Sequence, residues 1–155
     1  MTMETPQHLK LELEEFLRGG FAPVIILLQE FDHKKAAIIL DGLHFSAWIL
    51  LGHMRERQRT LSAFIRDPEN SPEVWEDAHW PENHQPASRE EWLEAINQFS
   101  EELEEVIQLI KLPETDLLKV QPNGKTIHWA AMAILHHNAY HIGQLKTVGR
   151  QVGVW

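Results

Sequence analysis

Cysteine is absent from this sequence of 155 residues. The chain therefore can form no disulfide, offers no thiolate to a metal ion and has no cysteine nucleophile. Basic residues are also few, because lysine and arginine total 14 against 23 acidic residues, for a formal net charge of −9. Proteins that bind nucleic acid through its phosphates need a basic surface, so we expect no nucleic-acid partner.

Long apolar runs are missing as well. Runs such as residues 24–28 and 48–51 are far shorter than the roughly 20 apolar residues that span a bilayer. The first ten residues are polar and lack the apolar core of a signal peptide. We therefore expect no membrane partner and a cytoplasmic location. The length and the 43% hydrophobic content suit a single domain over residues 1–155.

Hydrophobic periodicity predicts an all-α protein. Helices are expected over about residues 7–18, 23–31, 46–65, 88–112 and 126–151. Ser46 is a suitable N-cap, and Ser88 with Glu91 forms a capping box. In the helix after Ser88, apolar residues recur at spacings of three and four and predict a buried stripe. That stripe comprises Trp92, Ile96, Phe99, Leu103, Val106 and Ile110.

Residues 67–87 break this helical pattern. They contain four prolines and two tryptophans, Trp75 and Trp80, and show no helical period. We predict a long loop, and long loops in compact domains are often functional. Because tryptophan is costly to leave in water, its presence favours a loop that packs against the helices.

Histidine is abundant, with ten residues, and this composition makes metal binding worth testing. His137 and His141 lie one turn apart on the last helix, on the stripe where apolar core residues are expected. Burying two unpaired imidazoles would be costly, and a metal ion would remove that cost. The alternative is an ordinary pair of core histidines whose hydrogen bonds are satisfied by neighbouring residues.

A third ligand has to come from another helix. His53 is the best candidate, since it follows Phe45 and Ile49 at a spacing of four on the apolar side of helix 46–65. Three protein ligands would leave a coordination position for water or substrate, which is typical of catalytic sites. The H-E-x-x-H motif of zincins is absent. The two E-x-x-H matches do not fit a di-iron bundle, because Glu76-x-x-His79 falls in the predicted loop.

The remaining histidines have weaker signals. We expect surface positions for His8, His33, His44, His79 and His84, although the loop that holds the last two could fold over the site. His136 is expected to face a neighbouring helix or solvent, and His128 could support the ligands from a second layer. No general base can be named, although His136, Tyr140 and Gln144 lie in the right region. Gln144, three residues after His141, could orient that ligand.

Two segments together resemble the DinB/YfiT-like superfamily. They are Tyr140-His-Ile-Gly-Gln144 with its preceding histidines, and Ser46-Ala-Trp48 followed by His53. The resemblance covers about residues 9–155 and includes the loop with Trp80-Pro81. One departure is the apolar segment of residues 19–23, which is often more polar in related proteins.

The resemblance implies a four-helix bundle with one divalent metal, zinc or nickel, held by His53, His137 and His141, and often a homodimer. Members include thiol-dependent S-transferases, a maleylpyruvate isomerase that uses a low-molecular-weight thiol, and metal-dependent hydrolases of unknown substrate. We expect a metal-dependent transferase or hydrolase acting on a small molecule. The acidic net charge would repel anionic thiols or phosphates at long range and so mildly disfavours them as substrates. The alternatives are a non-catalytic metal-binding stress or interaction protein, and a helical interaction module without metal.

Overall fold

The structure is a computed structural model that describes residues 6–72 and 79–155. Within these residues the chain forms helices and no strand, as the hydrophobic pattern predicted. The helices are α1 (Gln7–Leu17), α2 (Val24–Gln29), α3 (His33–Ala36), α4 (Ala47–Arg66), α5 (Arg89–Lys111) and α6 (Ile127–Gln151). None of the helices in the described part of the chain is long and apolar enough to cross a membrane.

Helices α4 and α5 begin directly after the predicted capping residues Ser46 and Ser88, and α6 begins directly after Thr126, where the helical pattern predicted its start. The side-chain oxygens of Ser46, Ser88 and Thr126 each accept a hydrogen bond from the backbone N–H three residues later. These bonds satisfy donors that the first turn of a helix leaves without a partner. The box at Ser88 departs slightly from expectation, because the Glu91 carboxylate accepts from the backbone N–H of Ala87.

The short helix α3 was not predicted. The segment expected to be helical over residues 23–31 ends at Gln29, and the chain then starts a new turn at Asp32. The Asp32 carboxylate accepts hydrogen bonds from the backbone N–H groups of Lys34 and Lys35, at 2.8 and 3.0 Å. A local cap of this kind can start one helical turn without a hydrophobic period.

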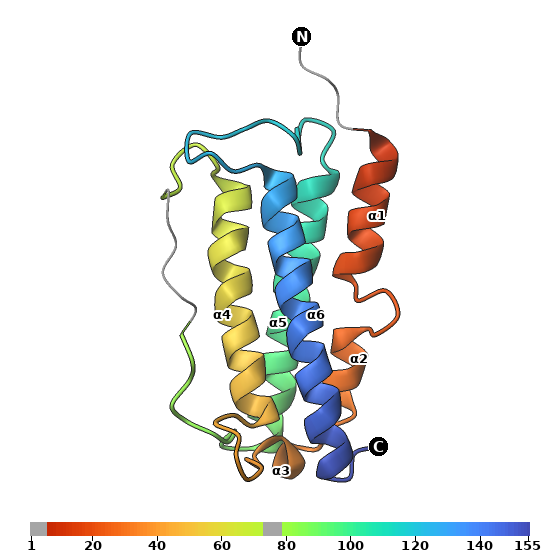
Figure 1. Cartoon of the computed structure of the whole chain (residues 1–155), viewed down its shortest axis with the longest axis vertical. Coiled ribbons are helices and arrows are strands. Elements are labelled where there is room, and N and C mark those ends of the chain that lie inside the picture. The colour runs from red at the N-terminus through yellow and green to blue at the C-terminus, as the bar shows by residue number, and fades with distance from the viewer. Residues whose placement is uncertain (1–5, 73–78) are drawn as a thin grey trace.

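The long helices lie side by side (Figure 1). Helix α4 packs against both α5 and α6, while α1 and α2 pack against α5 and α6 from the other side. Helices α4 and α5 run in the same direction, and the described residues 79–88 lead back along the molecule to the start of α5. The described parts of this connection, 67–72 and 79–88, contain neither helix nor strand, and Trp75 lies outside the described residues.

The apolar core consists of two clusters. All six residues of the stripe predicted on α5 are buried, and they divide between the clusters. Helix α4 passes from one cluster to the other between Met54 and Leu61, and α6 does so between Ile134 and Ile142. At this junction the buried side chains are polar, namely His53, Gln58, Asn138 and His141. The molecule therefore has a polar layer between two hydrophobic halves.

Candidate metal centre

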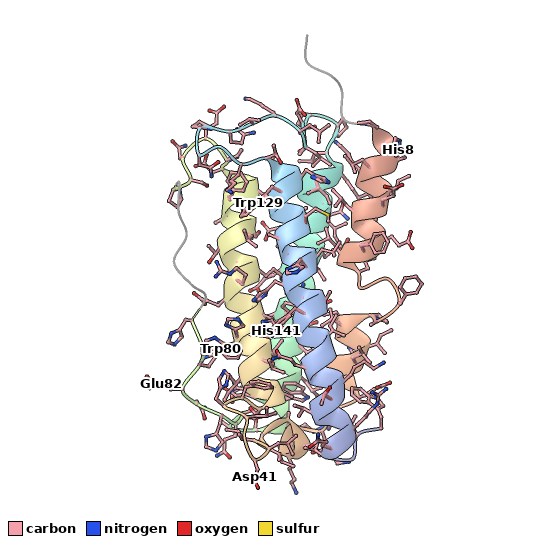
Figure 2. The ribbon with its side chains drawn as sticks, in the orientation of Figure 1. His8, Asp41, Trp80, Glu82, Trp129 and His141 are labelled. Atoms are coloured by element: carbon pink, nitrogen blue, oxygen red, sulfur yellow. The ribbon has the colours of Figure 1, made fainter. Side chains whose placement is uncertain are left out.

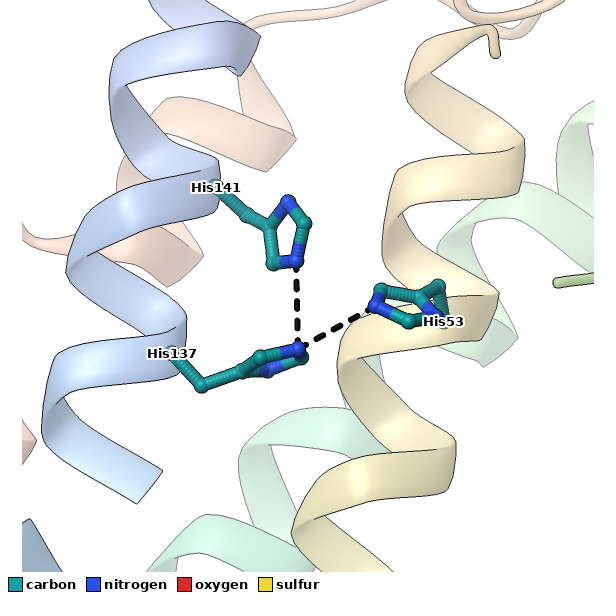
Figure 3. Close-up of side chains that lie close together, drawn as sticks. All are labelled: His53, His137 and His141. Carbon is teal, nitrogen blue, oxygen red and sulfur yellow. Dashed lines mark hydrogen bonds between the residues drawn. The ribbon is translucent and has the colours of Figure 1, made fainter. Parts of the chain in front are cut away.

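Three histidines meet in this polar layer (Figure 3). His53 comes from α4, while His137 and His141 come from α6 and lie one helical turn apart. The Nε2 atom of His137 lies 3.1 Å from Nε2 of His53 and 3.1 Å from Nε2 of His141. Among the described residues this is the group whose ligand atoms, all within 4.8 Å of one another, could hold a metal ion. The three residues selected from the sequence are therefore brought together.

The outer nitrogens of two of these rings have hydrogen-bond partners. His53 Nδ1 lies 3.1 Å from the backbone carbonyl oxygen of His79, and His141 Nδ1 lies 2.6 Å from Oε1 of Gln144. Both partners are acceptors, so each Nδ1 carries the proton and donates it. The Nε2 atoms of these neutral rings then carry lone pairs, and both point into the cluster. This arrangement of an outer acceptor and an inner lone pair is the usual one for metal-bound histidine.

Protons alone cannot satisfy the cluster. A neutral His137 carries at most one proton on Nε2 and can donate it to only one of the two neighbouring Nε2 atoms. The Nε2 lone pair of the other neighbour then has no donor, although it lies 3.1 Å from His137 Nε2. Metal–nitrogen bonds of about 2.0–2.1 Å at tetrahedral or octahedral angles separate ligand nitrogens by about 2.8–3.4 Å. The residues therefore fit one small divalent metal ion better than they fit a hydrogen-bonded core.

Burial keeps the imidazoles neutral. His53 and His141 are only 6% and 3% exposed, and desolvation lowers the pKa of both. Desolvation, together with the charges of His141 and His53, lowers the pKa of His137 to about 3. The nearby Arg57 acts in the same direction on the pKa of His53 and His137. Since only neutral imidazole binds a metal, the site is ready to bind at neutral pH.

The loop after α4 covers one side of the centre (Figure 2). The Trp80 ring stacks on the His53 ring, with centroids 3.8 Å apart and planes 11° from parallel, and meets His141 edge-on. Ser46 Oγ donates to the backbone carbonyl of His84 at 2.7 Å, which holds the loop against the start of α4. The prediction that Trp80 pins the loop to the helices is confirmed. The loop also supplies the His79 carbonyl, a contact that the sequence did not indicate.

Glycine at position 52 permits this close approach of the loop. A Cβ atom at Gly52 would lie 2.6 Å from Cγ of Pro81, closer than side chains tolerate. A larger residue would push Pro81 off the helix, and Trp80 with it.

A second side of the centre opens into a cavity of about 210 Å³ beside His137. Its lining comprises Arg57, Leu61, Trp129, Ala133, His136 and His137. Tyr140 is 62% exposed, and its ring lies 5.0 Å from the His141 ring, centroid to centroid. Because His137 is partly exposed and lines this cavity, a small molecule could reach it from this side.

The other sequence candidates have different roles. Gln144 contacts His141 as expected, and His136 is exposed at the cavity. His128 lies along a groove with residues of α1, so the idea that it supports the ligands is wrong. His8, His44, His79 and His84 are exposed, and His33 is partly exposed. The first residue of the rejected Glu76-x-x-His79 motif lies outside the described residues.

Comparison with known proteins adds no relative: no family model, no curated protein and no solved structure matches this chain. Function has to be inferred from the chemistry of the site.

Proposed function

We propose that this chain binds one divalent metal ion, zinc or nickel, through His53, His137 and His141. The observation that carries the proposal is the meeting of three Nε2 atoms while the Nδ1 atoms of His53 and His141 face acceptors. Imidazole suits zinc and nickel. Coordination would satisfy the Nε2 lone pair that no proton reaches, and would so stabilise the polar layer.

We further propose a single-domain four-helix bundle of the DinB/YfiT-like type, with a long Pro- and Trp-rich loop. Three observations support this. Helices α1 and α2 together occupy one side, opposite α4. The histidines lie on α4 and α6 at the positions that the resemblance implies. The connection between α4 and α5 joins parallel helices, as crossover connections in such bundles do.

The proposed activity is metal-dependent transfer or hydrolysis on a small molecule, with a low-molecular-weight thiol as a substrate or co-substrate. A bound divalent metal would supply Lewis acidity and lower the pKa of a thiol or water at its open position. The cavity beside His137 has the size for part of a small substrate. Arg57 lines it and supplies positive charge that suits the carboxylate of a thiol, despite the acidic net charge.

The chain's own residues have defined tasks in this proposal. The His79 carbonyl and Gln144 fix the ring orientations of His53 and His141 and keep Nε2 free for the metal. Trp80 covers the His53 ring and keeps water from that side. Substrate then enters from the side of His137. We include a cytoplasmic homodimer in the proposal, as the resemblance implies.

The alternative is a non-catalytic metal-binding stress or interaction protein. The burial of His53 and His141 favours it, because a metal there would tie α4 to α6. Metal binding would then stabilise the fold by mass action without turnover.

Metal content is the first test. Protein purified without a histidine tag should contain close to one equivalent of zinc or nickel per chain by mass spectrometry. The His137→Ala/His141→Ala double variant should contain none, and the matched control His136→Ala should retain it. A folded protein that takes up no metal, even after zinc or nickel is added, would exclude both the enzyme and the metal-binding alternative.

Activity is the second test. Metal-loaded protein should consume a low-molecular-weight thiol in the presence of an electrophile, or hydrolyse an activated ester, and chelation should abolish this. Full metal content without turnover across both classes would favour the non-catalytic alternative.

A further inference from the structure

A second cavity lies on the opposite face of α6. It has a volume of about 250 Å³, is open to solvent on one side, and is lined by α6, the end of α1, the start of α2 and the connection between them. Figure 1 shows that this connection lies on the side of α6 away from α4, so the cavity does not share the side where the histidines meet. Its lining includes Phe16, Phe21, Val24, Leu135, Asn138 and Ile142, and the described lining residues carry no charged side chain.

Asn138 is the polar exception in this apolar lining. The residue is only 5% exposed, and its Nδ2 atom is buried without a hydrogen-bond partner. Leaving a buried amide donor unpaired destabilises a protein. The wall of this apolar cavity therefore contains a residue whose buried donor has no acceptor within the protein.

The turn between α1 and α2 beside the cavity requires glycine at position 19. Gly19 has a φ of 107°, and a Cβ there would lie 2.6 Å from both the Ala22 oxygen and the Pro23 Cα. Phe21, at the tip of the turn, is fully exposed although it lines the cavity. A fully exposed phenylalanine beside an apolar cavity gives an entering ligand a further apolar contact.

We propose that this cavity binds an uncharged, largely apolar small molecule that carries one hydrogen-bond acceptor, such as a carbonyl oxygen, paired with Asn138 Nδ2. A dry cavity of about 150 Å³ accommodates benzene, so this one suits a ligand of roughly ten non-hydrogen atoms. The absence of charge in the lining disfavours carboxylates and ammonium groups, because they would lose hydration without compensation.

Water is a poorer occupant than such a ligand. A water molecule against this lining finds few polar partners, because Asn138 is the one polar side chain among the described lining residues. An apolar ligand with one acceptor satisfies the amide and fills the remaining volume at once.

Acetophenone and α-methylstyrene test the proposal, since they have nearly the same shape and differ in carrying a carbonyl oxygen or a CH₂ group. Both are titrated into ¹⁵N-labelled, metal-free full-length protein and followed by NMR. We expect saturable shifts at Gly19, Gly20 and Phe21 with both. Only acetophenone should shift the side-chain NH₂ signal of Asn138 downfield.

The variant Asn138→Leu isolates the hydrogen bond. The ratio of acetophenone to α-methylstyrene affinity should fall roughly tenfold in this variant. Ligand desolvation is the same for both proteins and cancels in that comparison. A second variant, Ala139→Leu, fills the cavity from α6 and should abolish binding of both probes. His136→Ala, on the same helix but outside this cavity, should change neither affinity.

Three results would overturn the proposal. These are no saturable binding up to the solubility limit of acetophenone, shifts centred on His53 and His141 instead of the turn, and an affinity ratio unchanged by Asn138→Leu. None of them bears on the proposed metal site, because every titration is done without metal.

Discussion

Two faces of α6 at the same height both bury polar side chains, but only one of them provides these side chains with polar partners. Toward α4, His137 and His141 meet a third imidazole, and the outer nitrogen of His141 has its own acceptor. Toward α1 and α2, the neighbouring residue Asn138 faces apolar side chains and has no partner for its Nδ2 atom. The helix is the same, so the difference comes from what packs against each face.

Three converging imidazoles and a single buried amide indicate ligands of different chemistry. Nε2 lone pairs that converge from two helices favour binding of a cation, since no arrangement of protons satisfies them all. A single unpaired amide beside an apolar cavity favours a ligand that has one hydrogen-bond acceptor and is otherwise apolar. The two sites therefore select ligands of different chemistry although they share one helical turn.

The largest effect should follow removal of a histidine. His141→Ala should weaken metal affinity by more than about 100-fold, because even loss of a residue that supports a ligand costs about 10–100-fold. Competition against a chromophoric chelator measures this. Acetophenone affinity should stay unchanged, and a parallel loss at both sites would mean that the two faces are not independent.

The next effect is the pH dependence of the metal-free protein. Burial lowers the pKa of His53, His137 and His141 below the ordinary value of 6.5. Below that value the unfolded chain binds protons that the folded chain does not. The free energy of unfolding should therefore fall with falling pH, by up to about 1.4 kcal/mol per pH unit for each histidine. For His137 this continues down to about pH 3.

Urea denaturation in the presence of a chelator measures this dependence. Carboxylates such as Glu102 also titrate at the acidic end, so His137→Gln is the reference. This variant should show a shallower fall between about pH 6.5 and pH 4.5, where histidine dominates. Equal slopes for both proteins would contradict the burial of a neutral His137.

Removing the support of a ligand should have a smaller effect. Gln144→Ala should lower metal affinity by about 10–100-fold, because His141 loses the acceptor that fixes its proton on Nδ1. Gln151→Ala, an exposed glutamine at the end of the same helix, is the matched control. An equal loss in the two variants would show that the Gln144 contact does not orient the ligand.

The smallest expected effect is a change in stability on replacing Asn138, on the face of α6 toward α1 and α2. Asn138→Leu should raise the free energy of unfolding by about 1 kcal/mol, since it replaces an unpaired buried amide with an apolar side chain of similar size. Asn97→Leu, at an exposed position on α5, should bring no such gain. Chemical denaturation measures both, and a clear loss of stability in Asn138→Leu would mean that the amide has a partner.

Local signals predicted much of the helical structure. Side-chain caps at Ser46, Ser88 and Thr126 act within three residues, and the stripe on α5 depends only on helical period, so both could be predicted from sequence. The histidine triad was also predictable, because each member lies on the apolar stripe of its own helix. The break before α3 was missed, since a single Asp32 cap competes with the apolar pattern around it.

Contacts between distant segments could not be predicted in the same way. Backbone carbonyls carry no sequence signature, so nothing in the residue pattern indicated that His79 supports His53. Trp80 was expected to pack somewhere, yet its stacking on His53 depends on how residues 79–84 cross α4 at Gly52.

The sequence by itself determined the long helices, the caps at Ser46 and Ser88 and the three histidines, because helical period and capping are local properties of the chain. Only the tertiary structure decided that the Nε2 atoms meet at 3.1 Å and that Asn138 faces a cavity without a partner. Those features depend on which helix packs against each face of α6, and residues far apart in sequence set that packing.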